Sequence, residues 1–212
     1  SKKISGVIAS ISTTSIESKR LSVEIEIENN EINKNDVENG YLLASKKNEL
    51  LGNVDIHTFP VDYSIDGLKG VKNPLGMFGD VLGLDLNIVS VKNNSLKTLI
   101  KCITKCDVDV YNVATSSYAA GLSILKEEEM NIGAVVIDMG ASTSSLGVFL
   151  DGKMVFTKII PFGGDEITLE LARYFSISIE EAEKLKVMHA SAIEGSDDAH
   201  VILEIPKFAE KE

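Results

Sequence analysis

Asp138 ends the apolar run at residues 135–137 and is followed closely by a set of very small residues. That set is Gly140, Ala141, Ser142 and Thr143. A turn built from such residues lets a phosphate approach the backbone N–H groups, because no large side chain blocks the way. Asp138 would then hold Mg²⁺ through a bound water, since this ion prefers few carboxylates and several waters. An ordinary hairpin with small residues at its tip is the alternative.

Two features further along the chain extend this interpretation. Gly163 and Gly164 open a predicted helix, whose first free N–H groups can bind an anion. Glu183 and Lys186 lie three residues apart on one face of the next predicted helix, where they could hold a ribose. A solvated helix ion pair of small energy is the alternative for that pair. Together, these residues predict a nucleotide site.

The elements around these residues follow from their sequence patterns. Residues 135–139 (VVIDM) are apolar on both faces, which predicts a central strand covered on each side. The Asp151-Gly152 pair between two apolar runs predicts a hairpin. Residues 163–175 are expected to form a helix, and the capping box of Ser178 and Glu181 opens another. A last short strand is expected at residues 201–205.

A small α+β unit is predicted upstream, over residues 21–112, in the order β-α-β-β-α-β. Its first strand alternates apolar and charged residues and is expected to be half exposed. Asn35 or Asp36 is expected to cap its first helix, which Gly40 weakens. Pro60 implies an edge strand or a bulge, and residues 67–83 are expected to form a structured loop.

The helices that follow also show clear patterns. The helix at residues 95–106 is predicted to be amphipathic. Its apolar stripe is Leu96, Leu99, Ile100 and Ile103. The helix predicted at residues 117–130 begins with small residues, Ala119 to Gly121, which allow very close packing against a neighbour.

The bulk composition excludes several classes of function. The formal net charge is −11, from 21 Lys and Arg against 32 Asp and Glu, so no basic stripe is available for nucleic acid. No apolar run approaches the roughly 20 residues that a membrane helix needs. Cys102 and Cys106 are expected to be free buried thiols. The three histidines, His57, His189 and His200, are expected to be structural or solvent-facing.

The sequence as a whole resembles the actin, Hsp70 and sugar-kinase superfamily, and within it the FtsA family of bacterial cell-division proteins. The stretch from residue 135 to 186 resembles this family, and HTFPVDYSIDGLKGVKNPLGM at residues 57–77 supports the family resemblance specifically. The resemblance implies an α/β, actin-like (ribonuclease-H-like) ATPase fold with an inserted small α+β domain of the 1C type. Residues 1–28 and 106–130 would belong to domain 1A, residues 29–105 to 1C, and residues 131–212 to the first part of 2A.

The resemblance also implies a function, an ATP-binding scaffold that polymerises, links FtsZ filaments to the membrane and recruits later division proteins through 1C. ATP and Mg²⁺ would be the cofactors, and the protein would lie in the cytoplasm at the inner face of the membrane at the division site. The loop expected to contact partners is Asn73, Pro74, Leu75, Gly76 and Met77. A pilus-assembly-type or other actin-like ATPase, or a small-molecule kinase of this fold, are the alternatives.

This sequence departs from the family pattern in ways that affect the chemistry. Only one phosphate hairpin is expected, so the chain would correspond to about the middle half of a family member, with an incomplete nucleotide site and without the terminal membrane helix. Ala141 and Ser142 replace two glycines of the commonest hairpin, and Ser145 replaces its second acid. Where relatives use Glu or Gln to position water, only Thr115, Ser116 and Ser117 are found. We therefore predict no catalytic residue and at most slow hydrolysis.

Overall fold

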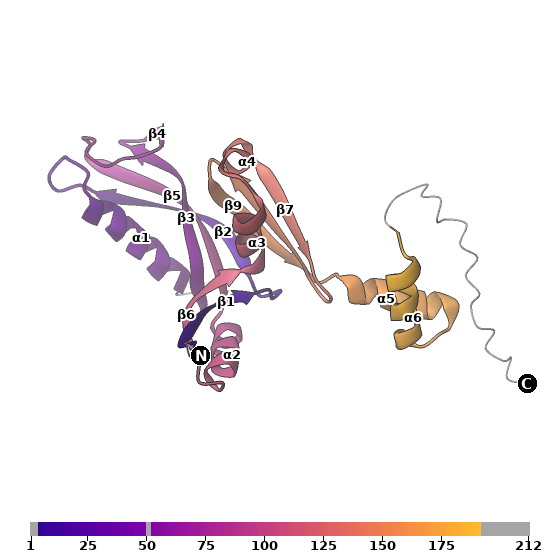
Figure 1. Ribbon diagram of the computed structural model, residues 1–212. Helices are drawn as coiled ribbons and strands as arrows, with labels where there is room; N and C mark the ends of the chain where they lie inside the picture. Colours follow the sequence, from indigo (N-terminus) through magenta and orange to yellow (C-terminus); the bar gives the residue numbers. More distant parts are fainter. Residues whose placement is uncertain (1–3, 50–51, 192–212) are drawn as a thin grey trace, which may run out of the picture. The chain divides into compact units, whose positions relative to one another are not determined.

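The computed structural model describes residues 4–49 and 52–191 (Figure 1). The chain divides into two compact units, with the boundary in the sequence between Pro161 and Phe162. The strand predicted at residues 201–205 and His200 lie outside the described residues. The first unit contains all of the strands that the structure describes, and the second contains two helices.

The first unit contains a four-stranded antiparallel sheet of order β2-β5-β3-β4. Its strands are β2 (Glu17–Glu26), β3 (Asn53–Ile65), β4 (Leu68–Val71) and β5 (Val81–Lys92), and helix α1 spans Lys34–Glu49. The even residues of β5, Leu82 to Ile88, are buried in one cluster with apolar residues of α1. A Cβ at Gly40 would lie 2.5 Å from Leu84 Cδ1. Gly40 therefore lets α1 approach β5, at the expense of helix propensity.

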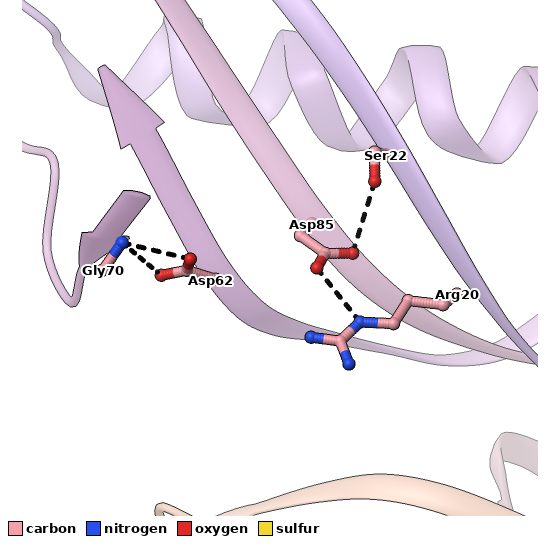
Figure 2. A network of polar contacts seen from close by, with 5 residues as sticks. All are labelled: Arg20, Ser22, Asp62, Gly70 and Asp85. Carbon is pink, nitrogen blue, oxygen red and sulfur yellow. Dashed lines mark hydrogen bonds and ion pairs between the residues drawn. The ribbon is translucent and has the colours of Figure 1, made fainter. Parts of the chain in front are cut away.

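The opposite face of this sheet is polar over part of its area (Figure 2). Asp85 accepts hydrogen bonds from Arg20 Nε at 3.0 Å and Ser22 Oγ at 3.4 Å. Asp62 lies opposite Asp85 on β3 and accepts the N–H of Gly70 at 3.1 Å. The Arg20 and Asp85 side chains are 61% and 32% exposed, so their ion pair contributes at most about 1 kcal/mol. The predicted alternation of apolar and charged residues along β2, the first strand of the α+β unit, is confirmed.

Some local predictions for this sheet are confirmed and others are wrong. The register of β3 on β5 shifts between Pro60 and Asp62, which is the predicted bulge. The N-cap of α1 is Asn33 rather than Asn35 or Asp36, because Asn33 Oδ1 accepts from the N–H of Asn35 at 2.8 Å. Asp36 takes part only from inside the helix, where its Oδ2 accepts the Asn33 N–H at 2.9 Å. β4 lies inside the predicted loop, because the tight turn at Asp66 and Gly67, both at positive φ, reverses the chain.

Two smaller sheets complete the first unit. β1 (Gly6–Ile11) and β6 (Asp109–Thr115) pair in parallel. β7 (Ala134–Met139), β8 (Ser144–Leu150) and β9 (Lys153–Ile160) form an antiparallel meander. The last strand of the predicted α+β unit is thus wrongly placed, because β6 joins β1 rather than the four-stranded sheet.

Three helices connect these sheets. They are α2 (Asn93–Thr104), α3 (Ser116–Ile124) and α4 (Glu127–Ile132), so the single helix predicted at residues 117–130 is broken at Leu125. As predicted, α2 packs an apolar stripe against the core that the three sheets share. The buried residues of that core include Ala9, Ile11, Val89, Val91, Val113, Val136 and Phe149. Within the first unit, one core therefore joins the four-stranded sheet to the meander.

Two further predictions for the first unit are wrong. β7 is an edge strand of the meander, and its Val135, Ile137 and Met139 side chains are 59%, 64% and 61% exposed. Only the face that carries Val136 is buried. Both cysteines are exposed, because Cys102 lies outside the apolar stripe of α2 and Cys106 follows the end of that helix.

The second unit contains α5 (Gly164–Phe175) and α6 (Ile179–His189). The predicted capping box opens α6: Ser178 Oγ accepts from the Glu181 N–H at 3.2 Å, and Glu181 Oε2 accepts from the Ser178 N–H at 3.0 Å. α5 ends at Ser176 in the left-handed region, with φ 53°. Among the described residues, no helix is long and apolar enough to cross a membrane.

Candidate functional site

The tip between β7 and β8 is a tight turn of small residues. The Gly140 N–H donates to the Thr143 carbonyl at 2.9 Å, and a Cβ at Gly140 would lie 3.1 Å from that oxygen. Ala141 and Ser142 are exposed. On the other side, Thr143 Oγ1 lies 3.2 Å from the Oγ of Ser12, which directly follows β1. The structure therefore brings Gly140 to Thr143 together as one compact surface turn.

Asp138 precedes this turn and faces the same side of the meander as Ser145, its opposite residue on β8. Ser145 Oγ donates to Asp138 Oδ2 at 3.4 Å. Ser145 Oγ also lies 2.6 Å from the Oγ of Ser116, the first residue of α3. Ser145 is buried, whereas Asp138 and Ser116 are half-buried. A carboxylate and a pair of hydroxyls thus lie beside the turn.

This set of groups fits a phosphate with a magnesium ion. Carboxylate and hydroxyl oxygens are the ligands that Mg²⁺ prefers, directly or through water. The close approach at Gly140 leaves little room for a side chain there, which keeps the backbone of the turn accessible. The Gly140 N–H is used within the turn itself, so it would not be available to a phosphate. In the described part of the chain, no group of three or more His, Cys, Asp or Glu could hold a metal by side chains alone.

In the second unit, the other predicted residues meet at the start of α5. Lys186 Nζ donates to the Gly164 carbonyl at 3.0 Å and to Thr168 Oγ1 at 2.7 Å, and it lies 2.7 Å from Glu183 Oε2. Thr168 Oγ1 in turn donates to Glu183 Oε2 at 2.5 Å. Gly163 is the residue before the helix, in an extended conformation. The structure therefore brings Gly164, Glu183 and Lys186 together, through Thr168.

These contacts change how the pair of Glu183 and Lys186 is understood. Hydrogen bonds first from Lys186 and then from Thr168 lower the pKa of Glu183 below its ordinary value. The Lys186 side chain is only 19% exposed. The pair is thus more than the solvated ion pair on a helix surface that was the alternative, because it connects α6 to the first turn of α5.

Beside this ion pair, between the two helices, lies an open pocket of about 750 Å³. Its lining includes Asp165, Thr168, Leu169, Ile179 and Glu183.

The loop predicted to contact partners is held by backbone hydrogen bonds and exposes apolar side chains. Gly76 has φ 78°, and its N–H donates to the Ile32 carbonyl at 2.8 Å. Asn73 Oδ1 accepts the Leu75 N–H at 3.2 Å, and Pro74 is buried. The exposed fractions of Leu75, Met77 and Phe78 are 47%, 42% and 73%. The loop thus has a fixed shape that presents an apolar tip.

A half-buried histidine contacts the residue that directly precedes α3. His57 Nε2 accepts the N–H of Thr115 at 3.1 Å, and the His57 ring lies 4.7 Å from the Tyr118 ring. Burial lowers the pKa of His57 to about 4. The prediction that His57 is structural agrees with this position. The Thr115 hydroxyl is fully buried and has no hydrogen-bond partner in the described structure.

Three residues of these sites were not given a role from the sequence. Ser12 reaches the hairpin from a distant part of the chain, and no local pattern marks it. Ser116 stands where relatives position water, but its sequence context did not indicate a contact with the hairpin. Thr168 could have been found, because it lies one helical turn after Gly164 on the face of α5 that meets α6.

Comparisons with known proteins match most of the chain to one family. The family model "Cell division protein FtsA" matches residues 135–212, and the model "SHS2 domain inserted in FTSA" matches residues 13–90. The FtsA protein of Rhizobium meliloti is 33% identical over 207 residues, which are 98% of this chain and 47% of that protein. The FtsA protein of Escherichia coli K12 is 28% identical, over 96% of this chain and 49% of that protein. The chain spans about half the length of the curated relatives it matches.

The solved structures agree on the fold. A type IV pilus biogenesis complex, PilM–PilN, contains a chain that matches 81% of this one and is itself covered over 47%, at 14% identity and a TM-score of 0.56. The fold is thus the predicted actin-like α/β fold, with an SHS2 domain as the inserted α+β unit. The predicted domain boundaries, with the insertion at residues 29–105, stay predictions.

Proposed function

The chain belongs to the FtsA family of cell-division proteins, and from that premise we propose that the tip of the β7–β8 hairpin binds the phosphates of ATP with Mg²⁺. One observation carries this proposal: Asp138 and two hydroxyls lie beside an exposed turn of small residues. The backbone N–H groups of Ala141, Ser142 and Thr143 would bind phosphate oxygens. Bound Mg²⁺ would neutralise charge on the phosphates.

Asp138 would orient a magnesium-bound water in this scheme. The hairpin lacks a second acid, because Ser145 stands opposite Asp138. A hydroxyl at that position can orient a neighbour but is too weak a base to remove a proton from water at neutral pH. We therefore expect binding with slow or absent hydrolysis.

In the second unit, taken by itself, Glu183 and Lys186 would bind a ribose. Gly163 and Gly164, which the sequence predicted to bind an anion, would lie beside that ribose instead. The Glu183 carboxylate is the natural acceptor for ribose hydroxyls. Thr168 and Lys186 orient it through the hydrogen bonds described above. The Asp165 and Glu166 side chains in the first turn of α5 oppose phosphate binding at that helix end. Their position favours a neutral ribose there over a phosphate.

For the longer protein, we propose the role of a division scaffold that polymerises, links FtsZ filaments to the membrane and recruits later division proteins. The apolar tip formed by Leu75, Met77 and Phe78 supports a partner-binding role for the inserted domain, because large exposed apolar side chains are typical of interaction sites. A pilus-assembly role is the second candidate. The PilM–PilN likeness favours it only at the level of the fold, whereas the FtsA relatives match in sequence.

Titration calorimetry with Mg·ATP tests the nucleotide proposal. Although only one phosphate hairpin is predicted, we expect it to suffice for saturable binding by the unchanged chain. This binding should be lost in Asp138→Asn, which keeps the shape of the side chain and removes its charge. Asp151→Asn is the matched control, since Asp151 lies in the turn at the other end of β8 and is 68% exposed. Equal binding by Asp138→Asn and the control would contradict the proposal.

A further inference from the structure

Two glycines allow α3 to lie unusually close to β8. A Cβ at Gly121 would lie 2.2 Å from Phe149 Cζ, and one at Gly147 would lie 3.1 Å from the Cβ of Ser117. Both distances are shorter than an ordinary contact between carbon atoms. Because of this approach, the first turn of α3 lies within hydrogen-bond reach of β8 and β9.

The two serines that begin α3 make different contacts there. Ser117 Oγ is buried and lies 2.9 Å from Thr157 Oγ1, which donates to the Leu146 carbonyl at 2.8 Å. That chain of hydrogen bonds ends on the backbone, so it is a packing contact. Ser116 Oγ instead lies 2.6 Å from Ser145 Oγ, which reaches Asp138. This second chain ends on the carboxylate beside the exposed turn.

The direction of the second chain follows from proton counting. A hydroxyl has one proton to donate and can accept from a neighbour. Since Ser145 Oγ donates to Asp138 Oδ2, it accepts at its other contact, so the proton between the two serines comes from Ser116. The hydrogen bonds are therefore donated in one direction, from Ser116 to Ser145 and from Ser145 to Asp138. A hydrogen bond to a charged oxygen is strengthened when its donor is itself a hydrogen-bond acceptor.

We propose that Ser116 and Ser145 are positioning residues that hold Asp138 Oδ2 through this directed chain and leave Oδ1 to orient the magnesium-bound water. The inference rests on the proposed function, because it concerns the same nucleotide site. It assigns a role to the serine that stands where the commonest family pattern has an acid. It also extends the site to Ser116, the first residue of α3, which lies 29 positions before Ser145 in the sequence.

Mg²⁺ dependence is the measurement that separates this role from a structural one. For each variant, the affinity for ATP is measured by calorimetry with Mg²⁺ and again with EDTA, and the ratio of the two affinities is compared. We expect Ser145→Ala to reduce the ratio about three- to tenfold with little change in the EDTA value. Ser116→Ala should reduce the ratio less, since it acts only through Ser145.

A double-mutant cycle supplies the sharpest test. If Ser116 acts through Ser145, adding Ser116→Ala to Ser145→Ala should change the ratio no further. Ser116→Thr, which keeps the hydroxyl, should retain the ratio of the unchanged chain. Ser123→Ala is the matched control, because its hydroxyl bonds only within α3, to the Ala120 carbonyl.

The outcomes distinguish this inference from the proposed function. If Ser145→Ala binds ATP saturably with the same ratio of affinities as the unchanged chain, the positioning role is wrong, whereas the proposed nucleotide site is not contradicted. Independent, additive effects of the two serines would overturn the directed chain. If the unchanged chain binds no Mg·ATP at all, the proposed function fails and this inference fails with it.

Discussion

Replacing Gly121 by alanine perturbs the packing on which the hairpin site depends. The new methyl group would begin 2.2 Å from Phe149 Cζ and 2.6 Å from Cε2, whereas carbon atoms in contact are about 3.5–4.0 Å apart. Phe149 is 1% exposed and lies in the shared core, so its ring cannot swing into solvent. Either the ring or α3 must move.

The expected magnitude is a balance of two effects. Overpacking of a core costs about 1–3 kcal/mol, and replacing glycine in a helix recovers about 1 kcal/mol. The free energy of unfolding should therefore fall by up to about 2 kcal/mol. For a chain of this size, the midpoint of thermal unfolding would fall by up to roughly 8 °C.

Thermal unfolding followed by circular dichroism measures the change. Ala119→Gly, at an exposed position of the same helix, calibrates helix propensity alone. The double variant Gly121→Ala with Phe149→Leu should lose less stability than the sum of the two single changes, because the smaller side chain makes room. A higher midpoint for Gly121→Ala than for the unchanged chain would refute the reasoning, since helix propensity would then outweigh the contact.

Three other predictions follow from single residues. Thr115→Val should raise the unfolding midpoint by roughly 2–4 °C, because it removes a buried hydroxyl without a partner; a lower midpoint would mean that the hydroxyl is satisfied. The pKa of His57 is about 4 in the folded chain and about 6.5 when unfolded, so only the unfolded chain gains this proton as the pH falls from 6.5 to 4. The free energy of unfolding should thus fall over that window, by about 1–2 kcal/mol after allowance for solvent screening. His57→Gln, which keeps an acceptor for the Thr115 N–H, should flatten the profile, and an unchanged profile would contradict the assignment. Ser178→Ala should speed amide hydrogen exchange in the first turn of α6 about fivefold, the equivalent of a lost cap of about 1 kcal/mol; unchanged exchange would mean that the capping box adds nothing.

Local patterns predicted local features well in this molecule. The capping box of Ser178 and Glu181 and the bulge at Pro60 depend on residues near one another in sequence, and both are present. The small residues at the start of α3 indicated a close approach, which is present at Gly121, although they did not indicate its partner, Phe149. The cap at Asn33 was missed by two residues, because several cap-forming residues follow one another there.

Long-range features could not be predicted in the same way. The apolar residues of β7 are consistent with a covered strand, yet the structure shows an edge strand with Val135 and Ile137 exposed. Periodicity reveals which residues share a face and not what covers that face. The contact of Ser116 with Ser145 depends on how α3 crosses β8, which no spacing in the sequence encodes. The roles of Asp138 and the turn in binding nucleotide remain predictions.

The most direct test of the central claim is to map where Mg·ATP binds on the ¹⁵N-labelled chain by two-dimensional NMR. We expect saturable shifts in the amide signals of residues 140–143 and at Ser145 and Ser116, with none of these in Asp138→Asn. Saturable shifts confined to other parts of the chain, or no shifts at any nucleotide concentration, would contradict the claim that the β7–β8 turn is a phosphate site.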